Sequence, residues 1–256
     1  MAAALSGVFS LFAAPVVFTA DEAALEHGGI VGFYERSQAK PEVRIDGNSA
    51  IQIPTSSGSS TIFSQSNADV QLTRTQSLVG LRYVGRVQQL RYSAMVGQFR
   101  KYEVEFSSGS STNRLEASDT GLVYGVGLAG SFIPESIASV GIGWDLQARE
   151  SRVDFERFHS DAGTVPANQR LVEDELQLGV TATKRFGEVA PYAGGKVNRW
   201  ITRLEDKGSG AQLSGHVDKA SALVGIEWTP TQGNTGFVEA SFFGDESVSA
   251  GWGFRF

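Results

Sequence analysis

The chain has 256 residues, a net charge of −6 and a sequence pI of about 5.2, and it contains no cysteine. The acidic balance argues against a nucleic-acid partner, and the absence of cysteine excludes disulfides and thiolate metal sites. The mean hydropathy of −0.12 is too low for a helical membrane protein. It is compatible with membrane-crossing strands in which only alternate residues face lipid.

The first 20 residues predict a secretory signal peptide, because residues 2–20 are apolar and carry no charge. The run lacks a Lys or Arg near its start, and bulky Phe18 lies close to the expected cleavage point after Ala20. A transmembrane helix is the alternative, although Pro15 lies inside the run and about 20 residues are needed. Residues 21–28 are expected to be a short polar lead-in to one domain over residues 29–256.

From residue 29 to the end, apolar and polar residues alternate, which is typical of β-strands with one face exposed. A tight turn is expected at residues 85–86, and a long polar connection at 37–75. Further polar loops are expected at 107–118, 160–169 and 205–215. The pattern predicts ten strands, at 29–36, 76–84, 87–106, 119–132, 138–158, 171–186, 189–204, 217–229, 236–243 and 248–256.

Five of these strands end on an aromatic residue, and four of them have a Gly or Pro shortly beyond it, which indicates a turn. In the last strand Val248, Ala250, Trp252, Phe254 and Phe256 share one face. This ending resembles the C-terminal assembly signal of bacterial outer-membrane β-barrel proteins, with Trp252, Phe254 and Phe256 as the signal residues. The alternative is the last strand of a soluble β-sandwich. The five aromatic strand ends are Tyr83, Phe132, Phe186, Trp228 and Phe256.

The resemblance implies an all-β fold, a transmembrane antiparallel up-and-down β-barrel of about ten strands in the bacterial outer membrane. The five aromatic ends then form a girdle at the periplasmic interface. The barrel-assembly machinery and outer-membrane lipid are the implied partners, and a monomer is expected. Arg100, Arg152 and Arg199 fall on the outward face near the outer ends of their strands, where a guanidinium can bind lipopolysaccharide phosphate or simply extend to the interface.

The same alternation directs charged side chains of both signs into the lumen. In a barrel of ten strands these groups can reach across and pair, which predicts a plugged lumen. A narrow polar channel is the alternative. The predicted lumen charge network comprises Arg82, Arg91, Asp145, Arg149, Glu175, Arg185, Lys196, Glu227 and Glu239.

Catalytic residues are not predicted. Outer-membrane proteases of the omptin family also have ten strands, with a His–Asp dyad and an Asp pair across the barrel mouth. Here only His159 with Asp161 and His216 with Asp218 are candidates, and no Asp pair accompanies them. No cofactor or metal motif is present. We therefore expect a structural or surface-binding barrel with an unidentified ligand, a narrow diffusion channel as the alternative, and an omptin-like protease as a distant third.

Overall fold

The computed structural model of the chain describes most residues from 28 onwards. The described residues are 28–40, 42–46, 51–55, 58–63, 69–88, 90–108, 111–118, 121–133, 140–160, 163–208, 210, 212–231 and 233–255. The predicted signal peptide, residues 21–27 of the lead-in and Phe256 lie outside them. Within this part of the chain, no helix is long and apolar enough to cross a membrane.

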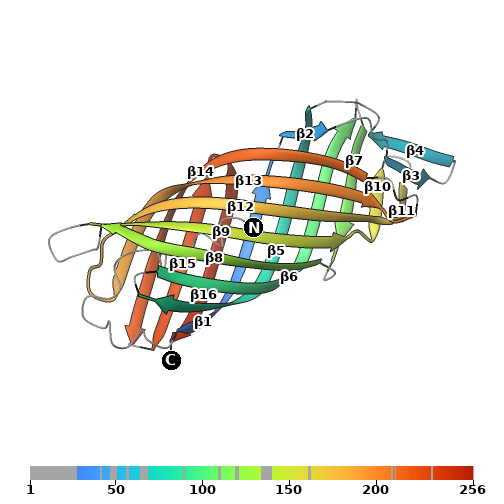
Figure 1. Ribbon diagram of the computed structural model, residues 1–256. Helices are drawn as coiled ribbons and strands as arrows, with labels where there is room; N and C mark the ends of the chain where they lie inside the picture. The colour runs from blue at the N-terminus through green and yellow to red at the C-terminus, as the bar shows by residue number, and fades with distance from the viewer. Residues whose placement is uncertain are drawn as a thin grey trace.

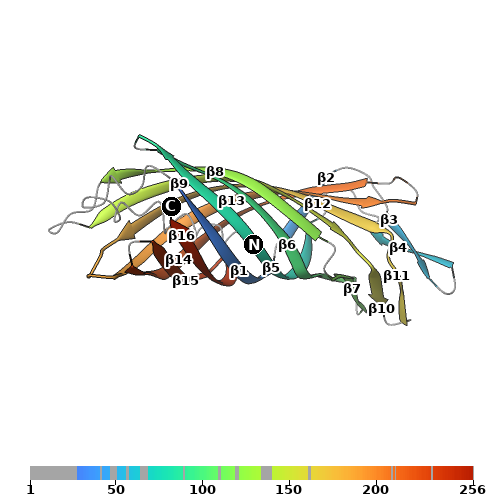
Figure 2. The same ribbon diagram turned by 90° about the horizontal axis from the view of Figure 1, so that it is seen from below.

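Ten strands of the described chain form a closed antiparallel barrel (Figures 1 and 2). The pairing of β1 with β16, from Gly29 opposite Arg255 to Ala39 opposite Asp245, closes the sheet. The predicted all-β barrel of about ten strands is confirmed. Its strands are β1 (Gly29–Ala39), β5 (Asp69–Val87), β6 (Leu90–Ser108), β8 (Gly121–Ile133), β9 (Gly141–Asp154), β12 (Gln169–Thr183), β13 (Val189–Asp206), β14 (Gln212–Thr231), β15 (Asn234–Phe242) and β16 (Asp245–Arg255).

Short strands lengthen the wall at one end of the barrel. β2 (Glu42–Asp46) pairs with both β5 and β14, so it joins them beyond the end of the shorter β15–β16 hairpin. β7 (Ser111–Ala117) pairs with β6 and with β10 (Arg157–Ser160), and β10 pairs with β11 (Gly163–Pro166). The loops predicted at 107–118 and 160–169 therefore contain strands. A separate two-stranded sheet consists of β3 (Ile51–Thr55) and β4 (Gly58–Phe63).

Alternate side chains along the strands point into and out of the barrel. The outer wall exposes large apolar side chains, among them Val96, Leu122, Val126 and Leu178. Contact between this continuous apolar surface and water would be unfavourable, whereas the hydrocarbon core of a membrane accommodates it. Closure of the barrel also gives each strand two hydrogen-bonded neighbours, as a strand in lipid requires.

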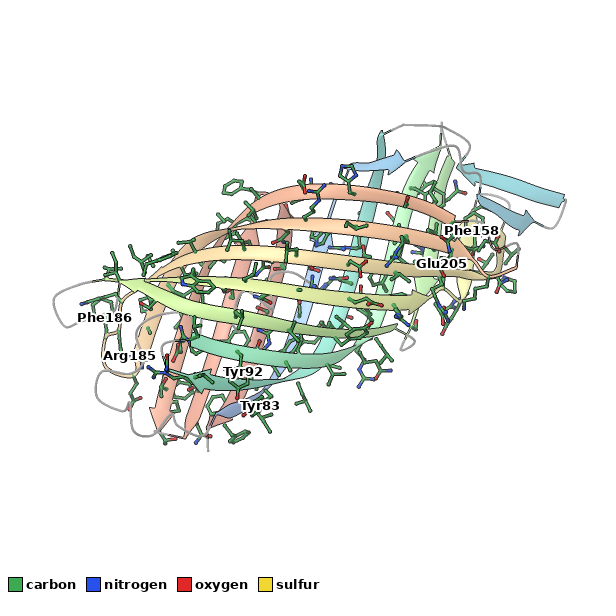
Figure 3. All side chains as sticks on the ribbon, in the orientation of Figure 1. Tyr83, Tyr92, Phe158, Arg185, Phe186 and Glu205 are labelled. Carbon is green, nitrogen blue, oxygen red and sulfur yellow. The ribbon has the colours of Figure 1, made fainter. Side chains whose placement is uncertain are left out.

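The two ends of the barrel differ. At one end the connections are short, as between β5 and β6, where Gln88 has a φ of 55°. At the other end the additional strands extend the wall (Figure 1). Because bacterial barrels have short periplasmic turns and longer outer loops, we assign the extended end to the outer side. Tyr83, Tyr92 and Phe186 lie toward the periplasmic end, whereas Phe158 and Glu205 lie at the outer end (Figure 3).

One local expectation was wrong. The turn predicted at 85–86 lies further along, because β5 continues to Val87 and Arg86 pairs with Arg91. Gly85 belongs to the strand, where a Cβ would overlap the ring of Tyr92. On β13, Trp200 is buried inside the barrel, and both pairings of the strand run without a register shift.

A β-bulge in β6 changes which residues face the lumen. Leu78 pairs with Phe99 and Ser77 pairs with Lys101, so Arg100 is the extra residue. Arg100 and Lys101 are both exposed. Odd-numbered residues of β6 face inward before the bulge and even-numbered ones after it, which places Tyr102 in the lumen.

Candidate functional site

The barrel lumen is filled by polar and charged side chains in its middle section. Each of the nine predicted charged residues lies on an inward-facing strand position or at the periplasmic end of the lumen. Arg185 is partly exposed at that end, and the other eight are buried. With Gln147 and Gln177 they form what we call the lumen lattice.

Close contacts join the side chains of the lattice, and one of them crosses the lumen. Arg149 of β9 and Glu175 of β12 form an ion pair whose side chains are 4% and 5% exposed. Arg82 of β5 donates a hydrogen bond of 3.4 Å to the Gln147 side-chain oxygen. Gln147 in turn donates one of 2.9 Å to the Asp145 carboxylate. The Arg149–Glu175 pair thus lies between the neighbouring strands β9 and β12, whereas the Arg82–Gln147 contact connects β5 to β9 across the interior.

Further contacts lie on the periplasmic side of the lattice. Arg185 pairs with Glu227 at 3.0 Å, and the Tyr192 hydroxyl donates a hydrogen bond of 3.1 Å to Glu239. Gly179 provides space on β12, since a Cβ there would overlap the carboxylate of Asp145. A larger residue at this position would displace that carboxylate.

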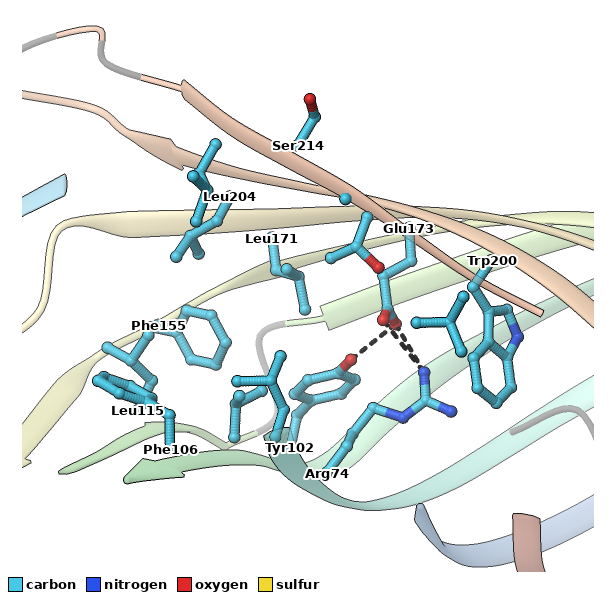
Figure 4. A pocket seen from close by; sticks show the side chains of 16 residues that line it. Arg74, Tyr102, Phe106, Leu115, Phe155, Leu171, Glu173, Trp200, Leu204 and Ser214 are labelled. Atoms are coloured by element: carbon cyan, nitrogen blue, oxygen red, sulfur yellow. Dashed lines mark hydrogen bonds and ion pairs between the residues drawn. The ribbon is translucent and has the colours of Figure 1, made fainter. Parts of the chain in front are cut away.

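A second polar layer, absent from the sequence prediction, crosses the lumen nearer the outer end (Figure 4). The Arg74 guanidinium donates hydrogen bonds of 3.1 and 3.2 Å to the two oxygens of Glu173. Tyr102 donates one of 2.6 Å to the same carboxylate. The Arg74 guanidinium carbon also lies 4.5 Å from the centre of a Trp200 ring. We call Arg74, Tyr102, Glu173 and Trp200 the outer floor, which draws on β5, β6, β12 and β13.

Part of the outer floor was accessible to sequence reasoning. Arg74 is an even number of residues from Arg82, so a longer strand than 76–84 would have included it. Glu173 already lies in the predicted strand 171–186, on the same face as Glu175. Glu35, buried on the inner face of β1, follows the parity of Val31 and Phe33 in the same way. The position of Tyr102 depends on the β6 bulge, for which the alternation gives no signal.

Above the outer floor is a cavity lined mainly by apolar side chains. It offers about 60 Å³ to the centres of water-sized molecules. The residues of the outer floor form one side of it, Thr202 and Ser214 are the other polar residues of the wall, and the remaining side chains are apolar (Figure 4). Apolar wall residues include Leu72, Val104, Phe106, Leu115, Phe155, Leu171, Leu204, Leu213 and Val217. This outer cavity lies in the extended part of the barrel.

Comparison with solved structures finds bacterial barrels of the same kind. The outer membrane protease OmpT of Escherichia coli matches at 12% identity with a TM-score of 0.44, covering 88% of this chain and 97% of its own. The translocator domain of the autotransporter NalP of Neisseria meningitidis matches at 11% identity with a TM-score of 0.44, covering 92% of each chain. The outer membrane protein OprG of Pseudomonas aeruginosa matches at 9% identity with a TM-score of 0.39, covering 90% of this chain and 97% of its own. No protein-family model and no curated protein matches the sequence.

The closed ten-stranded barrel with its exposed apolar wall determines the class. The chain is a bacterial outer-membrane β-barrel protein. Its specific activity does not follow from that class, since one barrel architecture carries many functions.

The outward-facing residues of this outer-membrane barrel change from apolar to charged toward its outer end. Arg152 contacts Glu150 at 2.6 Å, and Arg199 contacts Asp218 at 3.7 Å. Arg100 is exposed at the β6 bulge. The three arginines predicted to contact lipopolysaccharide therefore lie on the outer wall. Arg152 and Arg199 each have an acidic neighbour.

An ion-pair cluster lies beyond this charged zone, at the outer end of β9. Arg170 and Lys207 each contact Asp154 at 2.7 Å. The hydrogen bond from Arg170, followed by contributions from Lys207, lowers the pKa of Asp154 to about 2. Its carboxylate therefore remains ionised at physiological pH, and any stability it contributes would be lost only in strong acid.

The aromatic residues of the predicted girdle occupy periplasmic strand ends. Tyr83, Phe132, Phe186 and Trp228 are exposed there, and Trp228 packs edge-on against Trp252 at 5.7 Å between ring centres. Trp252 and Phe254 face outward on β16. Their role in assembly remains a prediction.

His159 lies in a local polar cluster on β10. Its Nε2 is 3.0 Å from Glu116, and its Nδ1 is 2.9 Å from the Thr164 hydroxyl. Asp161, its predicted partner, lies outside the described residues. Among the residues that the structure describes, no group of three or more His, Asp or Glu side chains forms a metal site.

The buried Arg149–Glu175 pair generates a stability prediction. Glu175→Ala should lower the free energy of unfolding by about 3–5 kcal/mol, because Arg149 is left charged and buried without this partner. Urea unfolding of the refolded barrel measures the change. As a matched control, Asp174→Ala removes one member of the exposed Arg203–Asp174 pair, whose side chains are 45% and 41% exposed. That loss should be below about 1 kcal/mol, and equal losses in the two variants would contradict the burial argument.

Proposed function

We propose that this protein is a non-enzymatic outer-membrane barrel, closed through its middle and used for binding at its outer mouth. The observation that carries the proposal is the lumen lattice, in which Arg82 of β5 contacts Gln147 of β9 across the interior and the Arg149–Glu175 pair is buried inside the barrel. It supports a rigid scaffold that presents outer strands and loops, which are the parts of a barrel that commonly bind ligands.

The size of the barrel also supports closure. Barrels with water-filled channels have about 16–18 strands, whereas a barrel of about eight is just wide enough for side chains to fill. Here Arg82, Asp145 and Lys196 are each no more than 3% exposed. A continuous water channel past these groups would hydrate and expose them. A narrow diffusion channel is the competing function, and electrical measurement separates the two.

In planar bilayers, we expect the unmodified barrel to show no steady conductance. The double variant Arg149→Ala with Glu175→Ala should conduct, because it removes two large side chains that meet inside the lumen. The control is Asp174→Ala with Arg203→Ala, a pair on the outer wall that should remain silent. Heat-modifiable migration on gels confirms that each variant is folded. Steady conductance of the unmodified barrel would contradict the proposed closed barrel and would favour the diffusion channel.

We also propose that the barrel-assembly machinery inserts the chain and that the outer charged zone contacts lipopolysaccharide. The lipid contact is supported by exposed Arg100, Arg152 and Arg199 near the outer interface, since guanidinium groups bind phosphate in two-point geometry.

Replacing all three arginines by Gln should reduce the lipopolysaccharide that copurifies with the barrel, because the phosphates lose their cationic partners. Quantifying bound lipopolysaccharide after identical purification tests this. The periplasmic variant Arg185→Gln is the matched control and should retain as much as the unmodified protein. Retention that is the same in the triple variant would contradict the proposed lipid contact.

A further inference from the structure

We infer that the outer cavity is a binding site for a neutral, mostly apolar molecule no larger than one aromatic ring. This names a ligand class for the outer mouth and rests on the proposed function, which places binding outside the lumen lattice. The inference follows from the cavity's wall, its volume, its charge balance and its position relative to the membrane.

The wall selects an apolar ligand with a flat face. Seven leucine and valine side chains line the cavity, and aromatic rings from two strands and a connecting segment also contribute to its wall. These rings belong to Tyr102, Phe106, Phe155 and Trp200. Tyr102 and Phe155 already pack edge-on, with ring centres 6.1 Å apart, so another ring can be accommodated in the same geometry.

The volume sets the scale of the ligand. The cavity measures about 60 Å³, which is less than half of the dry apolar cavity of about 150 Å³ that holds benzene. A single small ring is therefore the largest ligand that the outer cavity can take, and it must displace side chains of the wall to enter fully.

The outer floor selects against a charged ligand. Arg74 and Glu173 pair with each other, so their charges balance at this face of the cavity. A ligand ion would lose its hydration without meeting an unbalanced opposite charge, which is costly in apolar surroundings. One hydroxyl is compatible, because the Oε1 atom of Glu173 accepts from Arg74 and a carboxylate oxygen accepts more than one hydrogen bond.

The position of the floor places the cavity outside the hydrocarbon layer. On β12, the outward residues from Leu176 to Ala182 are apolar or small, and the next outward residue toward the outside is Asp174, beside Glu173. On β6, Tyr102 follows the exposed pair Arg100 and Lys101. The ligand therefore enters from the outer aqueous side, and the polar layers below separate it from the periplasm.

The test uses benzyl alcohol as the probe and the indole N–H signals of the barrel in lipid nanodiscs. The chain has four tryptophans, and Trp200 alone faces the cavity. Trp144, Trp228 and Trp252 point toward lipid and report the probe that dissolves in the bilayer. We expect the Trp200 signal to shift saturably, while the other three signals shift in proportion to total probe.

Two substitutions on one strand provide the matched comparison. Leu171→Phe on the inner face of β12 reduces the cavity and should weaken the apparent affinity at Trp200 by about tenfold or more. Leu178→Phe on the lipid face of β12 should leave it unchanged. Benzoate, of similar size but charged, should produce no saturable shift.

The result that overturns the inference is a Trp200 signal that stays fixed or follows the three lipid-facing signals. Equal affinities in the two leucine variants would overturn it as well. Both results are independent of conductance. A silent bilayer with no saturable Trp200 shift would leave the closed barrel intact and remove only the ligand site.

Discussion

Closure of the sheet by β1 and β16 is the constraint on which the rest of the structure depends. Within lipid, each backbone amide and carbonyl needs a partner in the protein, so an open sheet edge is not tolerated. Once ten strands close, the pleat sends alternate residues outward to lipid and inward to a narrow lumen. A charged residue on the inner face then has only other inner residues, or trapped water, as partners.

The lumen lattice and the outer floor are two arrangements in which inner charged residues find such partners. In the lattice, acidic and basic side chains from separate strands meet in the middle of the barrel, as Arg149 and Glu175 do. In the outer floor, Glu173 receives hydrogen bonds from Arg74 and Tyr102, and Trp200 covers the guanidinium. Above the floor the inner residues become apolar, because the extended wall encloses a cavity that polar groups no longer cross. The barrel thus separates a sealed middle from an outer space suited to small apolar molecules.

The sequence alone predicted the membrane-crossing strands, because the pattern that identifies them lies within each strand. A two-residue period assigns inside and outside along a strand, and the three residues Arg82, Asp145 and Lys196 that it directs inward are buried in the structure. The outer part depends on pairings between distant segments. The bridge that β2 makes from β5 to β14 has no signal in alternation, nor does the bulge at Arg100 that turns Tyr102 inward. For this reason the outer cavity emerged only from the structure.

Cysteine accessibility along the lumen tests the separation of the two spaces most directly, since the natural chain has no cysteine. Thr202 lines the outer cavity, and Thr181 is buried on β12 on the periplasmic side of Glu175. A small neutral methanethiosulfonate reagent added outside intact cells should modify Thr202→Cys and leave Thr181→Cys unmodified until the protein is unfolded. Modification of Thr181→Cys as fast as Thr202→Cys would show an open path through the lattice and contradict the account.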